Sequence, residues 1–278
     1  MAGCQRLGVP EALYLRPLIQ GLDRPDIELY RTLPAQLAID FRDRPGFLRG
    51  AFLSPLDYAR HGAEYQIIPG LCVSSSAPTG TIRLYINPNR KNITNLAVDI
   101  RVTSEIILAR IVLLEKFPSL PTEKRALTIL PMLPDPRAML VKADAAIVAH
   151  LTPSMAPDDL FSLDLVEEWY DLTGLPYVHG MWVVREDQFT EEEVRTLLQA
   201  KEQGTAALSQ ATLNLVPDVP LNEEELRRYY SSFSYEMSHQ QTESLTEFFR
   251  YAFYHGVLGD IPDLDFCTGP SLPGPPVN

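Results

Sequence analysis

The sequence predicts an α/β protein with two lobes around a cleft, and three observations lead to that prediction. Short apolar runs alternate with segments of helical periodicity along much of the chain. The 278 residues provide enough material for one large domain or two lobes. Two apolar segments, residues 81–86 and 177–184, bracket a central block. That layout is typical of a chain that leaves one lobe, builds a second and returns, with a ligand cleft between the lobes.

The first third of the chain contains short elements with clear boundaries. Residues 36–41 have a helical pattern, and residues 50–53 form a short apolar strand. Ser54 and Pro55 then open a helical turn, since Pro suits the first position of a helix. Apolar runs at 66–68 and 71–73 flank a Pro-Gly pair.

The central block repeats the strand and helix pattern. A polar, Pro-containing link at 87–92 separates it from the preceding strand. Thr103 and Ser104 are positioned to start a helix that runs through residue 114, because hydroxyl side chains cap free N–H groups. We expect further strands at 96–100, 126–130 and 145–149 and a short helix at 135–142.

The last third is more helical. Thr190 and Glu193 form a capping-box pattern, and residues 222–225 resemble another. An apolar stripe at residues 245, 248, 249 and 252 has helical spacing, and Gly256 is positioned to end that helix. Such a stripe predicts core packing. The Pro- and Gly-rich segment 269–278 is expected to be disordered.

Charge and cysteine usage narrow the function classes. The formal net charge is -12 and the isoelectric point is about 4.9, so nucleic acid and anionic membrane are poor partners. An anionic small molecule is still compatible, because helix N-termini bind anions locally. The distant cysteines at 4, 72 and 267 predict reduced thiols. With no export signal or membrane span apparent, we expect a cytoplasmic protein.

Residues 163–178 read LDLVEEWYDLTGLPYV. This stretch resembles the Asp-Leu-Gly-x-Glu-Trp-x-x-x-Thr-Gly-Leu-Pro-Phe-Val segment of the chorismate dehydratases of menaquinone biosynthesis. Three further stretches agree with that family in order and spacing, namely 54–58, 68–75 and 222–258. The similarity therefore covers most of the chain, and the block at 163–178 is its most specific part.

The resemblance implies a two-lobed α/β fold of the periplasmic-binding-protein type II class with two crossover strands. It also implies a lyase that dehydrates chorismate to 3-[(1-carboxyvinyl)oxy]benzoate in the futalosine pathway, without a metal or an organic cofactor. The expected partner is a small anionic, chorismate-like substrate. We expect residues 1–87 and 177–268 to form the first lobe and 88–176 the second.

Three polar positions of the family differ in this sequence. Tyr14 occupies the position of an Asn, Ala149-His150 replaces a Gly-Asp pair, and the run 75–82 departs from Ser-x-Gly-Pro-Val-x-Ser-Val. These replacements favour an alternative function: a non-catalytic cytosolic protein that binds a small aromatic or carboxylate ligand.

Hydroxyl, imidazole and backbone N–H groups near strand ends are the candidate ligand contacts. Each has a structural alternative, such as helix capping for Thr103 and Ser54 or a role in packing for the histidines. Arg16 suits a carboxylate but equally a surface position. The expected substrate-binding residues are Tyr14, Ser54, Ser75, Thr81, Thr103, Ser104, His150 and His179.

Two expectations concern mechanism. No Asp, Glu or His stands out as a general base, which leaves open a substrate carboxylate in that role. Ser75 and Thr103 are expected to lie on opposite lobes and to bridge one dianionic ligand across the cleft.

Overall fold

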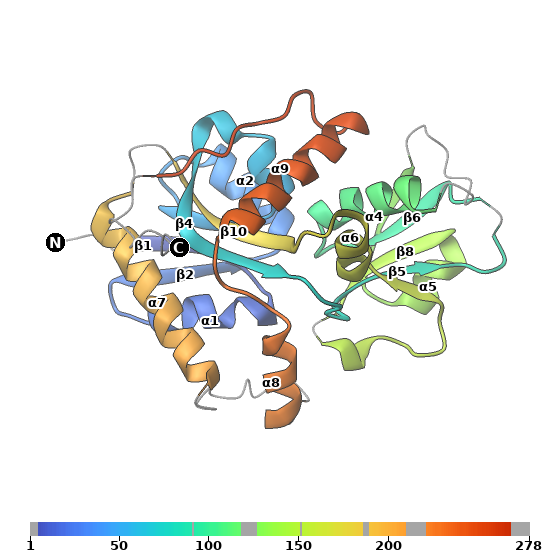
Figure 1. The fold of residues 1–278 in the computed structure, drawn as a ribbon, viewed down its shortest axis with the longest axis horizontal. Coiled ribbons are helices and arrows are strands. Elements are labelled where there is room, and N and C mark those ends of the chain that lie inside the picture. Colours follow the sequence, from blue (N-terminus) through green and yellow to red (C-terminus); the bar gives the residue numbers. More distant parts are fainter. Residues whose placement is uncertain are drawn as a thin grey trace.

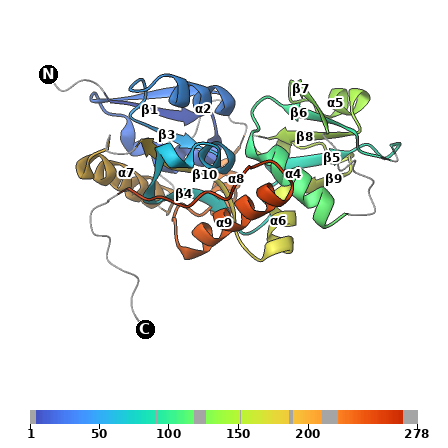
Figure 2. The ribbon, with the colours of Figure 1, turned by 90° about the horizontal axis from the view of Figure 1, so that it is seen from above.

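The computed structural model describes residues 5–90, 92–117, 127–150, 152–185, 189–209 and 221–267. Their strands form two separate five-stranded sheets, which lie side by side in Figures 1 and 2. The first sheet has the order β2-β1-β3-β10-β4, and the second has the order β7-β6-β8-β5-β9. Cys4 and the expected disordered segment 269–278 lie outside the described residues.

The first sheet combines parallel and antiparallel pairing. β1 pairs in parallel with β2 and β3, whereas β10 runs antiparallel to both β3 and β4. Its strands are β1 (Gln5–Pro10), β2 (Ile27–Thr32), β3 (Gly50–Leu53), β4 (Tyr65–Ser75) and β10 (Tyr177–Arg185). The connecting elements are η1 (Leu13–Leu15), α1 (Arg16–Ile19), η2 (Gln20–Leu22), α2 (Pro34–Asp43), α3 (Pro55–Ala59) and η3 (Gly62–Glu64).

The second sheet is built from one central stretch of chain. β6 pairs in parallel with β7 and β8, and β5 runs antiparallel to β8 and β9. Its strands are β5 (Ile82–Ile86), β6 (Asn95–Asp99), β7 (Thr128–Met132), β8 (Ala145–Ala149) and β9 (Ser162–Asp164). Its helical elements are α4 (Ser104–Glu115), α5 (Pro136–Lys142), η4 (Pro153–Met155) and α6 (Leu165–Thr173).

The chain passes to the second sheet between β4 and β5 and returns between α6 and β10. The expected division left residues 82–86 in the first lobe, but β5 pairs inside the second sheet. We therefore propose that the lobe boundary lies between the end of β4 and the start of β5. After β10 the chain adds α7 (Glu191–Ser209), α8 (Glu223–Ser231) and α9 (His239–Tyr254).

A hydrophobic cluster connects the two sheets. It contains buried side chains of β3 and β4, of β5 and α4, and of α9. Trp169 of α6 is fully buried in it, and its Nε1 donates to Ser244 Oγ of α9 at 3.2 Å. Continuous burial across the sheets fixes how the two lobes are placed around the space between them.

The expected helix ends occur where the sequence predicted them. Asn222 and Glu225 form a complete capping box, and Thr190 and Glu193 exchange the same contacts. Gly256 has a φ of 69°, the left-handed conformation that follows a helix end. The apolar stripe of α9 is buried, as its helical spacing predicted.

Candidate functional site

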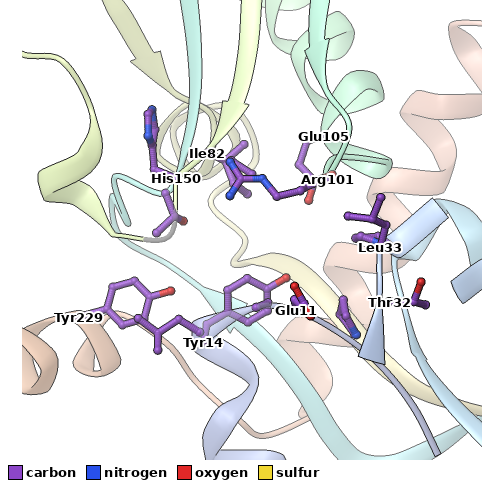
Figure 3. A pocket seen from close by; sticks show the side chains of 15 residues that line it. Glu11, Tyr14, Thr32, Leu33, Ile82, Arg101, Glu105, His150 and Tyr229 are labelled. Atoms are coloured by element: carbon purple, nitrogen blue, oxygen red, sulfur yellow. The ribbon is translucent and has the colours of Figure 1, made fainter. Parts of the chain in front are cut away.

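A cavity of ≈ 210 Å³ lies between the two sheets (Figure 3). One wall follows the ends of β1 and β2, and the opposite wall follows the end of β8, the start of β5 and the start of α4. Because parallel strands end at the same edge of a sheet, both walls carry the side chains that follow those ends. The lining residues are Pro10, Glu11, Ala12, Leu13, Tyr14, Thr32, Leu33, Pro34, Thr81, Ile82, Arg101, Glu105, Ala149, His150 and Tyr229.

Two tyrosines contribute to the first-sheet wall. Tyr14 lies in η1, with its ring centroid 5.5 Å from that of Phe233. Tyr229 comes from α8, and the neighbouring Tyr230 hydroxyl donates to the Leu13 carbonyl at 3.3 Å, which holds α8 against η1. Burial raises the pKa of both Tyr14 and Tyr229, so each phenol stays protonated near neutral pH.

Arg101 places a cation in the cavity. It follows β6 by two residues, and the buried Asp99 at the strand end accepts its Nε at 3.0 Å and its Nη2 at 2.6 Å. The same carboxylate accepts the Ala149 N–H at 3.0 Å. Asp99 therefore fixes the guanidinium on the rim of the second sheet. Among the described residues no acceptor contacts Nη1, which leaves that group for an anionic ligand.

Glu105 lies in the first turn of α4, on the same side of the cavity as Arg101 in Figure 3. Its Oε2 accepts the Thr103 backbone N–H at 2.8 Å. Burial raises the pKa of the Glu105 carboxyl, and the nearby charges of Asp57 and Asp99 raise it further. The other acidic residue of the cavity, Glu11, is exposed.

His150 and Thr81 complete the second-sheet wall. The Nε2 of His150 lies 2.7 Å from the Tyr85 hydroxyl. Burial and the positive charges of Arg101 and Arg83 lower its pKa to about 4, so His150 is neutral at pH 7. The Thr81 carbonyl accepts the backbone N–H of His150 at 2.7 Å, and the Thr81 hydroxyl forms a hydrogen bond with the Thr79 hydroxyl. Of the expected contact residues, the structure thus brings Tyr14, Thr81 and His150 to this cavity.

Ser75 and His179 lie beneath the cavity instead of lining it. Both are buried, with Ser75 Oγ 3.0 Å from His179 Nε2. The His179 ring centroid lies 5.2 Å from that of Tyr14, so this pair packs behind the cavity wall. The polar run that predicted an exposed contact at Ser75 instead continues strand β4 into the core.

The hydroxyls of Ser54 and Ser104 accept backbone N–H groups at the start of α3. Ser54 caps α3, since its Oγ accepts the Asp57 N–H at 3.3 Å and donates to the Asp57 carboxylate at 2.6 Å. Ser104 Oγ accepts the Leu56 N–H at 2.9 Å, which connects α4 to α3. Both hydroxyls are thus engaged inside the protein.

Thr103 lines a different hollow, of ≈ 560 Å³, between α2, α3 and α4. It precedes α4 as expected, but its side chain forms no capping bond; Glu105 accepts the Thr103 N–H. The expectation that Ser75 and Thr103 bridge one ligand is therefore corrected: neither hydroxyl lines the cavity described above. Arg16 belongs to a third hollow, beside β2.

The sequence reasoning missed Glu11, Arg101, Glu105 and Tyr229. One local signal was available, because Asp99 lies near the end of the predicted strand 96–100 and Arg101, its ion-pair partner, follows that strand directly. In the part of the chain that the structure describes, no group of three or more His, Cys, Asp or Glu side chains is arranged to hold a metal ion. Within the same residues no helix is long and apolar enough to cross a membrane.

Comparison with known proteins identifies the same architecture. A family model described as menaquinone biosynthesis matches residues 6–254. Protein AF1704 of Archaeoglobus fulgidus is 17% identical with a TM-score of 0.68, over 91% of this chain and 98% of that one. The alkanesulfonate-binding protein SsuA of Xanthomonas axonopodis pv. citri, bound to MOPS, is 14% identical with a TM-score of 0.60, over 94% and 96%.

A third similar structure comes from Candida albicans. A Candida albicans protein, described as exhibiting the generic periplasmic binding protein fold, is 10% identical with a TM-score of 0.56, over 92% of this chain and 91% of that one. At these identities the structural matches show the fold alone, and that fold is the periplasmic-binding-protein-like fold that the family resemblance implied.

Proposed function

Since this chain belongs to the menaquinone-biosynthesis family, we propose that it dehydrates chorismate to 3-[(1-carboxyvinyl)oxy]benzoate. The observation that supports this function best is Arg101, which Asp99 holds in a cavity between the sheets. Chorismate carries two carboxylates on a small ring. A volume of ≈ 210 Å³ is below the roughly 300–1,000 Å³ of sites for drug-sized ligands and suits such a compound.

The reaction removes the ring proton beside the enolpyruvyl ether and the neighbouring hydroxyl, and the ring becomes aromatic. In the proposed complex a substrate carboxylate binds the free Nη1 of Arg101. The Tyr14 and Tyr229 phenols donate to polar substituents, and apolar side chains such as Ile82 pack against the ring. The main contribution of these residues is to orient the substrate and exclude water. The futalosine pathway and the cytoplasm are the proposed setting.

A second candidate is ligand binding without catalysis. Two of the positions that depart from the family pattern, Tyr14 and His150, line the cavity itself. A bulky phenol and a neutral imidazole at these positions change the polar groups that a ligand meets. This observation favours a binding protein for a small aromatic carboxylate, and it uses the same Arg101 contact.

Incubation of the purified protein with chorismate tests both candidates. Mass spectrometry detects the dehydrated product, and titration calorimetry measures binding. Product formation supports the dehydratase, whereas saturable binding without product supports the binding protein. Absence of both contradicts both candidates, provided that circular dichroism shows a folded sample.

Two arginine variants test the role of the cavity cation. Arg101→Gln is expected to weaken chorismate binding about ten-fold or more, because a charge-assisted hydrogen bond is lost. Arg101→Lys keeps the charge but loses the bidentate geometry of the guanidinium, so its affinity for chorismate should lie between those of the wild type and Arg101→Gln. Arg137→Gln is the matched control, since Arg137 pairs with Asp159 on the surface with its side chain 60% exposed. Equal binding by all three variants would contradict the assigned carboxylate site.

A further inference from the structure

The hollow that Thr103 lines is separate from the cavity that contains Arg101. Among the described residues the two spaces share no lining residue. One side of the hollow comes from α2, α3 and the strands β3 and β4 of the first sheet, and the other side comes from α4 and β7 of the second sheet. Its volume of ≈ 560 Å³ lies within the roughly 300–1,000 Å³ typical of small-molecule sites.

Apolar side chains cover much of the hollow, and some of them remain accessible. Ile39 of α2 and Ile129 of β7 are 43% and 39% exposed, and both line this space. Ile106 and Ile107 of α4 line it between them. The hollow therefore presents apolar surface from both sheets that a bound apolar group would remove from water.

Two buried polar groups of the first sheet and α3 also line the hollow, and each leaves an atom without a hydrogen bond. Tyr65 is 2% exposed, and among the described residues its phenol forms no hydrogen bond. Asp57 is 9% exposed; Ser54 Oγ donates to its Oδ2, and no described group donates to its Oδ1. Buried polar atoms in native proteins are normally paired. One donor and one acceptor are therefore left for a ligand.

The charges near these two groups favour a neutral polar ligand group over an anion. Burial raises the pKa of the Asp57 carboxyl, whereas the positive charges of Arg60 and His61 lower it. Arg42, the other cation of the hollow, is paired with Asp43, which accepts its Nη2 at 2.8 Å. Positive and negative charges thus offset one another at this end of the hollow.

We propose that this hollow is a second ligand site, for a small apolar compound that carries one hydroxyl group. The ligand hydroxyl donates to Asp57 Oδ1 and accepts from the Tyr65 phenol, and the apolar part packs against Ile39 and Ile129. One hydroxyl satisfies both buried groups, because it is at once a donor and an acceptor. Burial raises the pKa of Tyr65 to about 12, so the phenol stays protonated as a donor.

4-Propylphenol is a suitable probe, because its hydroxyl and its propyl chain lie at opposite ends of one small molecule. Titration calorimetry with the full-length protein should show saturable binding with a Kd of about 1 mM or below. 4-Propylbenzoate carries a carboxylate in place of the hydroxyl. It should bind at least about ten-fold more weakly, because its charge would lie against the Asp57 carboxylate.

Two variants locate the probe in the hollow. Tyr65→Phe should fold normally, since it removes a hydroxyl that no described group contacts, and it should bind 4-propylphenol about two- to ten-fold more weakly. Ile129→Ala should weaken binding about three-fold or more through lost apolar contact. The matched controls are Tyr254→Phe and Val141→Ala, whose residues are 79% and 78% exposed and lie outside the hollow.

Binding of 4-propylphenol that both hollow variants weaken and both controls leave unchanged supports the second site. Absence of saturable binding to the folded wild type overturns the proposal. Binding that either hollow variant leaves unchanged also overturns it, because the phenol then lies elsewhere. Equal or tighter binding of 4-propylbenzoate contradicts the choice of a hydroxyl compound. If Tyr65→Phe does not fold, Ile129→Ala decides alone. Chorismate takes no part in these measurements, so their outcome is independent of the proposed dehydratase function.

Discussion

The Asp99 carboxylate lies 2.6 Å from Nη2 of Arg101, and the same oxygen accepts the Ala149 N–H at 3.0 Å. Asp99 ends β6 and Ala149 ends β8, so one buried carboxylate connects two adjacent strand ends and aims a cation into the space between the sheets. The position of the Arg101 guanidinium on this wall therefore depends on a fully buried carboxylate behind it.

Asp99→Asn should show how much chorismate binding depends on the orientation of Arg101, because the substitution leaves the charge of the arginine in place. The amide is nearly isosteric but offers only one acceptor and no charge. We expect chorismate binding to weaken by about ten-fold, which is about 1.4 kcal/mol, and the free energy of unfolding to fall by about 1–3 kcal/mol. Calorimetry and urea denaturation measure these changes. Asp159→Asn is the control, because an exposed ion pair contributes only about 0–1 kcal/mol; equal effects of both substitutions would refute this assignment.

Much of the fold was predictable from local patterns. Residues 50–53 and 145–149 were predicted as strands with the bounds that β3 and β8 have, because each is a short apolar run with clear breaks. β1 and β2 were missed. β2 is the outer strand of its sheet and includes the charged residues Glu28 and Arg31, so it lacks the continuous apolar run that marks an inner strand.

The Pro-Gly pair at 69–70 shows how sheet pairing overrides a turn signal. β4 continues through it as one strand, with Gly70 at a φ of 75°. The pairing of β4 with β10 is irregular between Met181 and Val183, opposite this stretch. A bulge thus accommodates Pro69, which has no backbone N–H, and Gly70, which has a positive φ.

The candidate site was less predictable than the fold. Thr81, Tyr14 and His150 were named from a resemblance; Thr81 and His150 adjoin strand ends of the second sheet, and Tyr14 lies in η1 after β1 of the first sheet. Glu105 and Tyr229 line the same cavity because the fold brings α4 and α8 to its opposite walls. No local sequence pattern predicts that arrangement. Ser75 was predicted as a ligand contact from the resemblance and its place at a strand end, whereas its partner His179 lies on a strand about a hundred residues later.

Ser75→Ala should affect stability more than binding. It removes the hydroxyl from His179 Nε2, and among the described residues Nδ1 of that ring already lacks a partner. A buried polar atom left unpaired costs about 1–3 kcal/mol. Urea denaturation should show this loss, while the Kd for chorismate changes less than about three-fold. Ser231→Ala, on the exposed surface of α8, is the control; a ten-fold loss of binding with unchanged stability would restore Ser75 as a ligand contact.

Gly204→Ala should disrupt the packing of α7 on α1. A Cβ at Gly204 would overlap the carbonyl oxygen of Pro17, an overlap that only backbone movement relieves. The better helix propensity of Ala, about 1 kcal/mol, should be outweighed, with a net loss of about 1–3 kcal/mol. Thermal denaturation measures it. Gly259→Ala is the control, because its Cβ would meet no atom within 4 Å; equal melting temperatures for the two variants would contradict this close contact.

His150 should make the protein sensitive to mild acid. The pKa of His150 is about 4 in the folded state, against 6.5 in the unfolded chain. Between these pH values the unfolded state binds a proton at this residue and the folded state does not. Its contribution to the free energy of unfolding is therefore present above pH 6.5 and lost as the pH falls towards 4, by about 3 kcal/mol in total. About 2 kcal/mol of this loss falls between pH 7 and pH 5.

His150→Gln isolates this contribution from that of His179, whose pKa is also lowered by burial, to about 3. At pH 7 the variant should be less stable than the wild type, because the Tyr85 hydroxyl loses its imidazole partner. The difference should shrink or reverse by pH 5, since Gln binds no proton in either state. Urea denaturation at several pH values measures it, with His239→Gln, whose side chain is 91% exposed, as the control. A difference that stays constant from pH 7 to pH 5 would show that His150 takes up a proton as readily in the folded protein as in the unfolded chain, and that the wall beside Arg101 is more hydrated than its burial indicates.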